Sequence, residues 1–148
     1  MLTNDPEDPV FQDLDRFFQS QGCTLVDLGL RTSKGTTSVH VVLHSPQGLG
    51  IDDLSRVHRL LVPRLEELLK TDELALELGS PGLERVLKYK RELGLYQGKK
   101  AKLFLQGASD WEEGVLGVFA DGALTFETKS GSRSVTVEQI QKAKLHDL

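Results

Sequence analysis

Histidines and paired carboxylates are the side chains of this sequence that could bind a metal or exchange protons, and their spacing argues against both roles. His40 and His44 fall on one face of a predicted strand, where four residues of separation place them about 13 Å apart, too far to share one ion. Asp52–Asp53 and Glu66–Glu67 lie in a predicted helix. Adjacent residues of a helix point about 100° apart, so the two carboxylates of each pair do not face one site. The sequence has no nucleophile elbow and no phosphate-binding Gly-Lys-Ser/Thr segment. We therefore expect neither enzymatic activity nor a bound metal or cofactor.

The tetrapeptide Gly79-Ser80-Pro81-Gly82 matches the GxxG loop with which KH domains clamp a nucleic-acid backbone. That loop joins two helices, whereas this tetrapeptide comes after a predicted strand, and Pro81 lacks an N–H that could bind a phosphate. A turn explains the same residues: Pro81 presets φ at the second turn position, Gly82 permits a positive φ next to it, and the Ser80 hydroxyl caps the turn. We predict a structural turn at Ser80, Pro81 and Gly82.

Composition indicates an ordinary globular protein with an uneven charge distribution. The 148 residues are 39% hydrophobic, and no apolar run approaches the roughly 20 residues that span a bilayer. The acidic first residues differ from a secretory signal, so we expect a cytoplasmic protein without a membrane partner. Cys23 is the only cysteine, which excludes a disulfide within the chain. The net charge is −4, but residues 1–88 carry −5 and residues 89–148 carry +1, so the two halves favour different partners.

Apolar spacing in the first half predicts the order helix, strand, strand, helix, strand. Helical periodicity covers residues 10–18 and residues 54–68, and Asp52 and Asp53 lie in the first turn of the second helix, where they favour its dipole. Pro63 is expected to kink the second helix. Period-two alternation predicts strands at residues 24–32, 36–45 and 72–80, the first two forming a hairpin.

The second half is predicted to contain short antiparallel strands separated by Gly, Asp and Ser turns. Asp121-Gly122 is its strongest hairpin signal, and residues 137–141 predict one helical turn with Ile140 inward. Such a pattern suits a small closed barrel of the SH3-like (Sm-like) or OB type. The overall expectation is an α+β protein with an α/β domain at 1–88, a linker at 88–98 and a barrel domain at 89–148. The predicted strands lie at residues 99–107, 111–120, 122–129, 132–137 and 143–148.

Several segments resemble the ribosome maturation factor RimP family. "LELGSPGLERVLK" is similar to the strand and "SSPG-L-(D/E)-R-P-L" signature of that family, and "LGIDDLSRVHRLL" to its "G-I-(T/S)-(L/I)-D-D" helix opening. "YQGKKAKLFL" resembles its "GKKVKVKL" strand, and "WEEGVLGVFADGALTFE" its "F-x-G-x-L" hairpin. "VTVEQIQKAKL" is similar to its closing "I-P-(F/Y)-x-x-I-x-K-A-R-L" segment. The similarity covers most of the chain.

The resemblance implies a cytoplasmic, monomeric, non-enzymatic factor that binds transiently to the small ribosomal subunit during its assembly. Its expected partners are a basic small-subunit ribosomal protein and the neighbouring ribosomal RNA. It also implies an α/β domain followed by an SH3-like barrel, in agreement with the order predicted from apolar spacing.

On this basis we predict partner-binding roles for Arg85, Lys88, Lys99, Lys100 and Lys102, with the three clustered lysines facing RNA. Two alternatives assign these residues structural roles. Arg85 could fix the turn by pairing with Glu84 or Asp72, and the lysines could protect a barrel edge from strand pairing.

Acidic residues surround Trp111 where the family commonly has basic ones, namely Asp110, Glu112 and Glu113, which argues against RNA contact by that hairpin. Two other functions stay open: an Sm-like RNA-binding or RNA-chaperone module, and a protein-interaction adaptor unrelated to ribosomes. An Sm-type function would require a ring of subunits, and an adaptor would not cosediment with small subunits.

Overall fold

A computed structural model describes residues 1–146 of the chain, which form two compact units. One unit is Pro6–Pro81, and the other combines Met1–Asp5 with the chain from Gly82 onward. Within the described residues the units contain three α-helices and two sheets, so the predicted α+β class is confirmed. None of these helices is long and apolar enough to cross a membrane.

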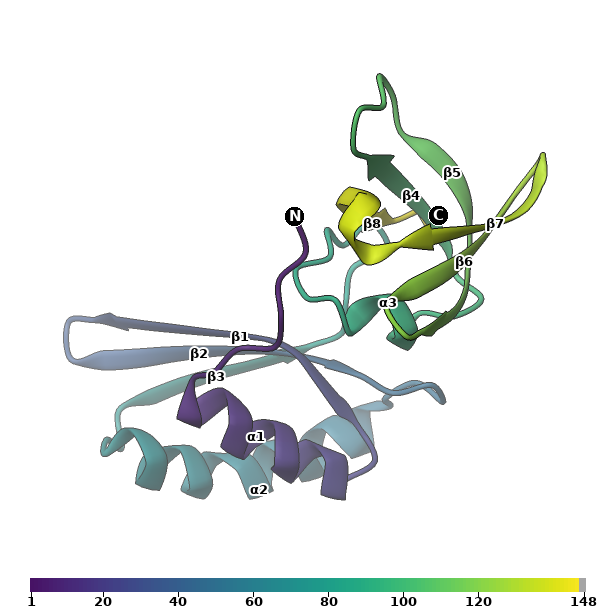
Figure 1. Ribbon diagram of the computed structural model, residues 1–148. Helices are drawn as coiled ribbons and strands as arrows, with labels where there is room; N and C mark the ends of the chain where they lie inside the picture. The colour runs from purple at the N-terminus through teal and green to yellow at the C-terminus, as the bar shows by residue number, and fades with distance from the viewer. Residues whose placement is uncertain (147–148) are drawn as a thin grey trace. The chain divides into compact units, whose positions relative to one another are not determined.

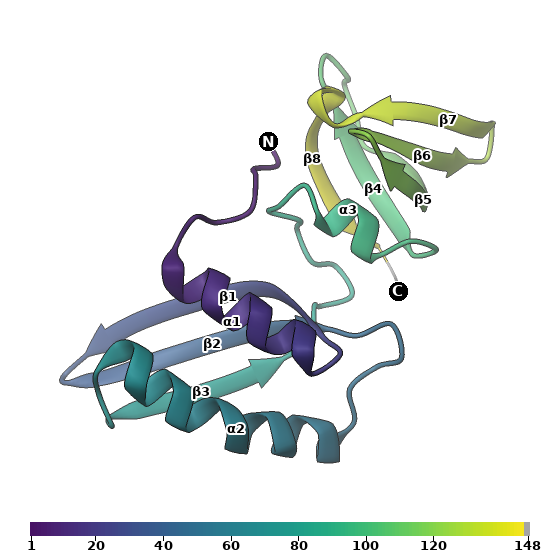
Figure 2. The ribbon, with the colours of Figure 1, turned by 60° about the horizontal axis from the view of Figure 1, so that its bottom comes forward.

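The Pro6–Pro81 unit has the predicted order of elements, which are α1 (Pro9–Ser20), β1 (Thr24–Ser33), β2 (Thr36–His44), α2 (Ile51–Leu69) and β3 (Leu74–Gly79). Its sheet has the order β1-β2-β3, with β1 and β2 antiparallel and β3 parallel to β2. The parallel pair requires a long crossover, which α2 supplies. Both helices lie on the same face of the sheet (Figure 1 and Figure 2).

Local chemistry determines where the two helices of this unit begin. The Asp8 carboxylate accepts a hydrogen bond from the Val10 N–H at 2.9 Å, and Pro9 is the first helical residue of α1. At α2 the Gly50 N–H donates to the Asp53 carboxylate at 3.1 Å, and the helix continues through Pro63 to Leu69. The core between helices and sheet is formed by Phe11, Leu14, Phe18, Cys23, Leu25, Val39, Val41, Leu43, Val57, Leu61 and Leu65.

The second unit contains one antiparallel sheet of five strands in the order β7-β6-β5-β4-β8. Asp121 and Gly122, with φ values of +53° and +75°, form the tight β5–β6 hairpin that the sequence predicts. The helical turn at Val137–Gln139 and the burial of Ile140 are also as predicted. The elements of this unit are α3 (Glu92–Leu95), β4 (Lys100–Leu105), β5 (Glu112–Ala120), β6 (Ala123–Thr128), β7 (Gly131–Thr136) and β8 (Ile140–Leu145).

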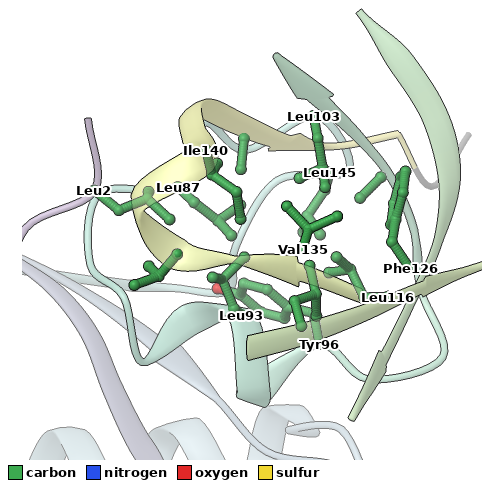
Figure 3. Close-up of a cluster of buried hydrophobic side chains, with 14 residues drawn as sticks. Leu2, Leu87, Leu93, Tyr96, Leu103, Leu116, Phe126, Val135, Ile140 and Leu145 are labelled. Atoms are coloured by element: carbon green, nitrogen blue, oxygen red, sulfur yellow. The ribbon is translucent and has the colours of Figure 1, made fainter. Parts of the chain in front are cut away.

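The first residues of the chain pack against this sheet rather than against the unit that comes next in sequence. Leu2 is 6% exposed and belongs to the core of the second unit, where Figure 3 shows its side chain beside Leu87 and Ile140. The Thr3 N–H donates to the Lys88 carbonyl and the Lys90 N–H donates to the Thr3 carbonyl, each at 2.9 Å. These bonds form a short parallel bridge, and Met1–Asp5 therefore belong to the unit whose strands lie beyond Gly82, with Leu2 in its core.

Residues 88–98, which the sequence suggested as a linker, are part of the core of the second unit. Glu92 and Leu93 in this segment are completely buried, and Tyr96 is 1% exposed. The compact units divide at Pro81/Gly82, because the backbone after that point already pairs with β8. The Leu87 N–H donates to the Ala143 carbonyl, and the Leu145 N–H donates to the Arg85 carbonyl, each at 2.9 Å. The segment therefore lacks the sparse contacts that define a linker.

The break after β3 has a different backbone from the one expected at Ser80, Pro81 and Gly82. Gly82 is absent from the residues with positive φ, and a Cβ atom built on it would meet nothing within 4 Å. The turn begins at Gly82, two residues later than expected, and is closed by the hydrogen bond from the Arg85 N–H to the Gly82 carbonyl at 3.1 Å. Gly82 is thus the first residue of the turn, and the expectation that it requires glycine for its conformation is wrong.

Candidate functional site on the second unit

Arg85, the first of the predicted binding residues, is held by a buried carboxylate. Its Nε donates to Glu92 Oε1 at 2.6 Å and a terminal guanidinium nitrogen donates to Glu92 Oε2 at 3.1 Å. The Arg85 side chain is 11% exposed and that of Glu92 is fully buried. Arg85 therefore pairs with a carboxylate, as the structural alternative expected, but the carboxylate is that of Glu92 and not that of Glu84 or Asp72.

Glu92 also organises the backbone around Arg85. Its Oε2 accepts hydrogen bonds from the Lys88 N–H at 2.8 Å and the Tyr89 N–H at 3.0 Å, and its Oε1 accepts one from the Tyr96 hydroxyl at 3.1 Å. Burial of the phenol and the adjacent Glu92 carboxylate raise the pKa of Tyr96. This network holds the segment that presents the Lys88 side chain at the surface.

Lys88 lines a groove of about 640 Å³ together with Trp111 and two lysines of β8, Lys142 and Lys144. The rest of the groove wall is mainly apolar and includes Leu87. The residues that line it include three lysines and no aspartate or glutamate. We call this feature the Trp111 groove. A cationic groove with an aromatic side chain is suited to an anion that also has a flat apolar surface.

Trp111 is fixed in the groove by neighbours on β4 and β8. The Phe104 ring packs against it edge to face, with ring centres 5.5 Å apart. The Lys144 ammonium lies 5.0 Å from the centre of the indole, within cation–π distance. Phe104 pairs with Lys142 in the β4–β8 register, which explains why these side chains share one face of the sheet.

Two of the three clustered lysines lie on the same outer face. Ala101 and Leu103 of β4 are buried, so alternation directs Lys100 and Lys102 to the opposite side, where Lys102 pairs in register with Lys144. Lys99 precedes β4 and is partly buried. The structure therefore joins Lys100 and Lys102 with the lysines of β8 in one basic face, which also borders the Trp111 groove.

Two of the three acidic residues near Trp111 pair with cations, and none of the three lines the Trp111 groove. Glu112 accepts hydrogen bonds from Arg133 at 2.9 and 3.1 Å, and Glu113 lies 3.4 Å from the Lys102 ammonium. The Asp110 carboxylate accepts a hydrogen bond from the Trp111 N–H at 2.8 Å. The sequence argument against RNA contact therefore applies to the acidic hairpin itself and does not extend to the lysine-lined groove beside it.

Sequence reasoning missed Glu92, Lys142 and Lys144. The two lysines alternate with buried Ala143 and Leu145, a pattern that could have placed them on the outer face of the last strand. Glu92 offered no such signal, because a carboxylate in a charged segment is usually solvated. Among residues 1–146, no three His, Cys, Asp or Glu residues are grouped so that they could hold a metal ion.

Comparison with known proteins identifies the family of this chain. Residues 14–84 match the family model described as the RimP N-terminal domain. The chain is 31% identical to "Ribosome maturation factor RimP" of Borrelia hermsii over 124 residues, covering 84% of this chain and 85% of that protein. It is 28% identical to the protein of the same name from Borrelia garinii subsp. bavariensis over 142 residues, covering 95% and 96% of the two chains. The chain belongs to the RimP family of ribosome maturation factors.

Proposed function

We propose that this protein binds transiently to the small ribosomal subunit during its assembly, through a basic ribosomal protein and the neighbouring ribosomal RNA. Membership of a family named for ribosome maturation supports a role in ribosome assembly. The observation that carries the proposed binding mode is the opposite charge of the two units. Pro6–Pro81 contains 7 Lys/Arg against 12 Asp/Glu, and the remaining residues contain 11 against 10.

The acidic unit is the part suited to a basic ribosomal protein, and the basic face of the second unit is the part suited to RNA. On that face the ammonium groups of Lys100, Lys102, Lys142 and Lys144 belong to adjacent, paired strands. Phosphate contacts made by such a row release counterions, so its affinity falls steeply as salt increases. Lysines that only protect a sheet edge from strand pairing make no phosphate contacts, so the salt dependence of binding distinguishes that role from RNA contact.

We further propose that the five antiparallel strands form an SH3-like barrel and that the protein acts as a cytoplasmic monomer without catalytic activity or a cofactor. The strand order and the short turns support the barrel, because successive strands pair and β8 returns beside β4. The commitment of Glu92 and Arg85 to each other supports a structural role for this buried ion pair.

Gradient sedimentation of extracts from cells that lack this protein tests the proposal. Immature small subunits should accumulate, and the purified protein should cosediment with small subunits rather than with large ones. Normal subunit profiles together with a failure to cosediment would refute the ribosomal role and favour an unrelated adaptor. Ring-shaped oligomers in light scattering, with binding to RNA but not to subunits, would instead favour the Sm-like module.

Charge reversal on the basic face provides a matched comparison. Lys100→Glu with Lys102→Glu should weaken small-subunit binding and flatten its salt dependence, because both phosphate-facing charges are lost. Lys34→Glu with Lys70→Glu makes the same change in net charge at exposed positions of the acidic unit. Equal losses in the two pairs would mean that only net charge matters, and the assignment of the basic face to RNA would be wrong.

A further inference from the structure

The Trp111 groove differs in charge from a second groove on the same unit. The second groove, on the β4–β5–β6 side, places Lys100 and Lys129 beside Glu113 and Glu127. Its lining contains two lysines and two glutamates, whereas the Trp111 groove is lined by three lysines with no carboxylate among them. The Trp111 groove is therefore the stronger attractor for an anion.

We propose that the Trp111 groove binds single-stranded RNA, with one unpaired base stacked on the indole and the flanking phosphates held by Lys88 and Lys142. This inference deepens the proposed function and rests on it for the biological source of the RNA. The two lysines lie on neighbouring segments, one before α3 and one on β8, which are joined by the hydrogen bond from the Leu87 N–H to the Ala143 carbonyl. A strand of nucleic acid that follows the groove brings its phosphates to both ammonium groups.

The indole is prepared for stacking by its neighbours. Phe104 holds it edge to face, which limits its rotation before a ligand arrives. Lys144 lies over the ring in the free protein. Base stacking on an aromatic side chain is stronger than a cation–π contact at a partly exposed site. A base can therefore take the place of the ammonium, and the flexible Lys144 side chain can turn to a phosphate.

Other occupants fit the groove less well. A basic ribosomal protein would meet three lysines and be repelled. Bases inside a duplex are already stacked, so they cannot lie flat on the indole, and a free phosphate would leave the aromatic surface unused. An acidic peptide satisfies the charge but supplies no base, and oligoglutamate represents it in the binding experiment.

Fluorescence of the full chain tests the proposal directly, because Trp111 is its single tryptophan. A short oligoadenylate should quench this fluorescence on binding. An abasic ribose-phosphate oligomer of the same length, a duplex RNA and an oligoglutamate should quench it far less. Equal quenching by oligoglutamate or by the abasic oligomer would show a general polyanion site and overturn the base-stacking assignment.

Variants then identify the groups responsible, with binding measured by the anisotropy of a labelled oligoadenylate. Trp111→Ala should weaken binding about 5- to 150-fold, and Trp111→Phe should lose less while keeping the contact with Phe104. Lys142→Gln should reduce the slope of log affinity against log salt by about 0.7, as expected for one phosphate on a single strand. Lys129→Gln, which removes the same charge in the other groove, should leave affinity nearly unchanged.

Circular dichroism of each variant verifies its fold. Folded Trp111→Phe and Trp111→Ala proteins that bind as tightly as the unmodified chain would refute the inference, as would a larger loss from Lys129→Gln than from Lys142→Gln. The outcome is separable from that of the proposed function. Oligoadenylate binding without small-subunit binding would overturn only the ribosomal role, and the reverse result would overturn only the stacking site.

Discussion

Replacing Glu92 by alanine should strongly destabilise the second unit. The carboxylate is fully buried and accepts two hydrogen bonds from Arg85, two from backbone N–H groups and one from the Tyr96 hydroxyl. Its removal leaves a guanidinium that is 11% exposed without its counter-charge. Breaking a buried ion pair by removing one partner costs about 3–5 kcal/mol, because the remaining charge stays desolvated.

The energies of the other lost hydrogen bonds set an upper limit to this loss of stability. Each donor left dry would cost about 1–3 kcal/mol, and a full sum with the ion pair would approach the whole stability of a typical domain. Water that enters the space of the deleted side chain can satisfy some of these donors. We therefore expect a loss of about 3–5 kcal/mol for Glu92→Ala.

Urea unfolding monitored by Trp111 fluorescence measures this loss in the same unit, since the tryptophan directly precedes β5 and packs against Phe104 of β4. Glu84→Ala is the matched control, because it removes a carboxylate from an exposed position next to Arg85 and should change stability by less than about 0.5 kcal/mol. A double-mutant cycle of Glu92→Ala with Arg85→Met should show strong coupling. Equal effects of Glu92→Ala and Glu84→Ala would show that the buried network contributes nothing, and the reasoning would fail.

Three further outcomes are expected from urea unfolding measured in the same way. Gly114→Ala should destabilise the second unit by about 1–3 kcal/mol, because a Cβ at that position would lie 2.5 Å from the Glu127 carbonyl oxygen. Gly82→Ala is the control: Gly82 has open space and an ordinary φ, so this change should be neutral or slightly stabilising. Leu2→Ala should cost about 2 kcal/mol in this unit, since its side chain is buried in the core; no change would mean that the first residues do not belong to it. The raised pKa of Tyr96 predicts that stability falls as pH rises above about 10, because the phenol of the unfolded chain loses its proton first. The decline should reach at most about 1.4 kcal/mol per pH unit. Tyr96→Phe should flatten this decline, and an unchanged slope in the variant would contradict the prediction.

Much of the architecture results from local patterns in the chain. Periods of 3.6 and 2 in the apolar residues place the helices and strands, and the positive φ values of Asp121 and Gly122 arise from the dipeptide itself. The family can also be identified from such segments, since the "SPGLER" stretch and the closing "KAKL" stretch occur as sequence signatures. These features depend on residues that are close together in the chain, so no knowledge of distant partners is required.

Only the tertiary structure shows which distant residues of the chain contact one another. Glu92 is buried only because Arg85, two N–H groups and a phenol converge on it, and periodicity cannot report such convergence. Thr3 pairs with backbone far along the chain, at Lys88 and Lys90, and this pairing carries Leu2 into a core that local pattern would assign to later residues. The Trp111 groove likewise requires Lys88, Trp111 and β8 to meet. The sequence specifies these side chains, but their common surface exists only when the strand order places β8 beside β4.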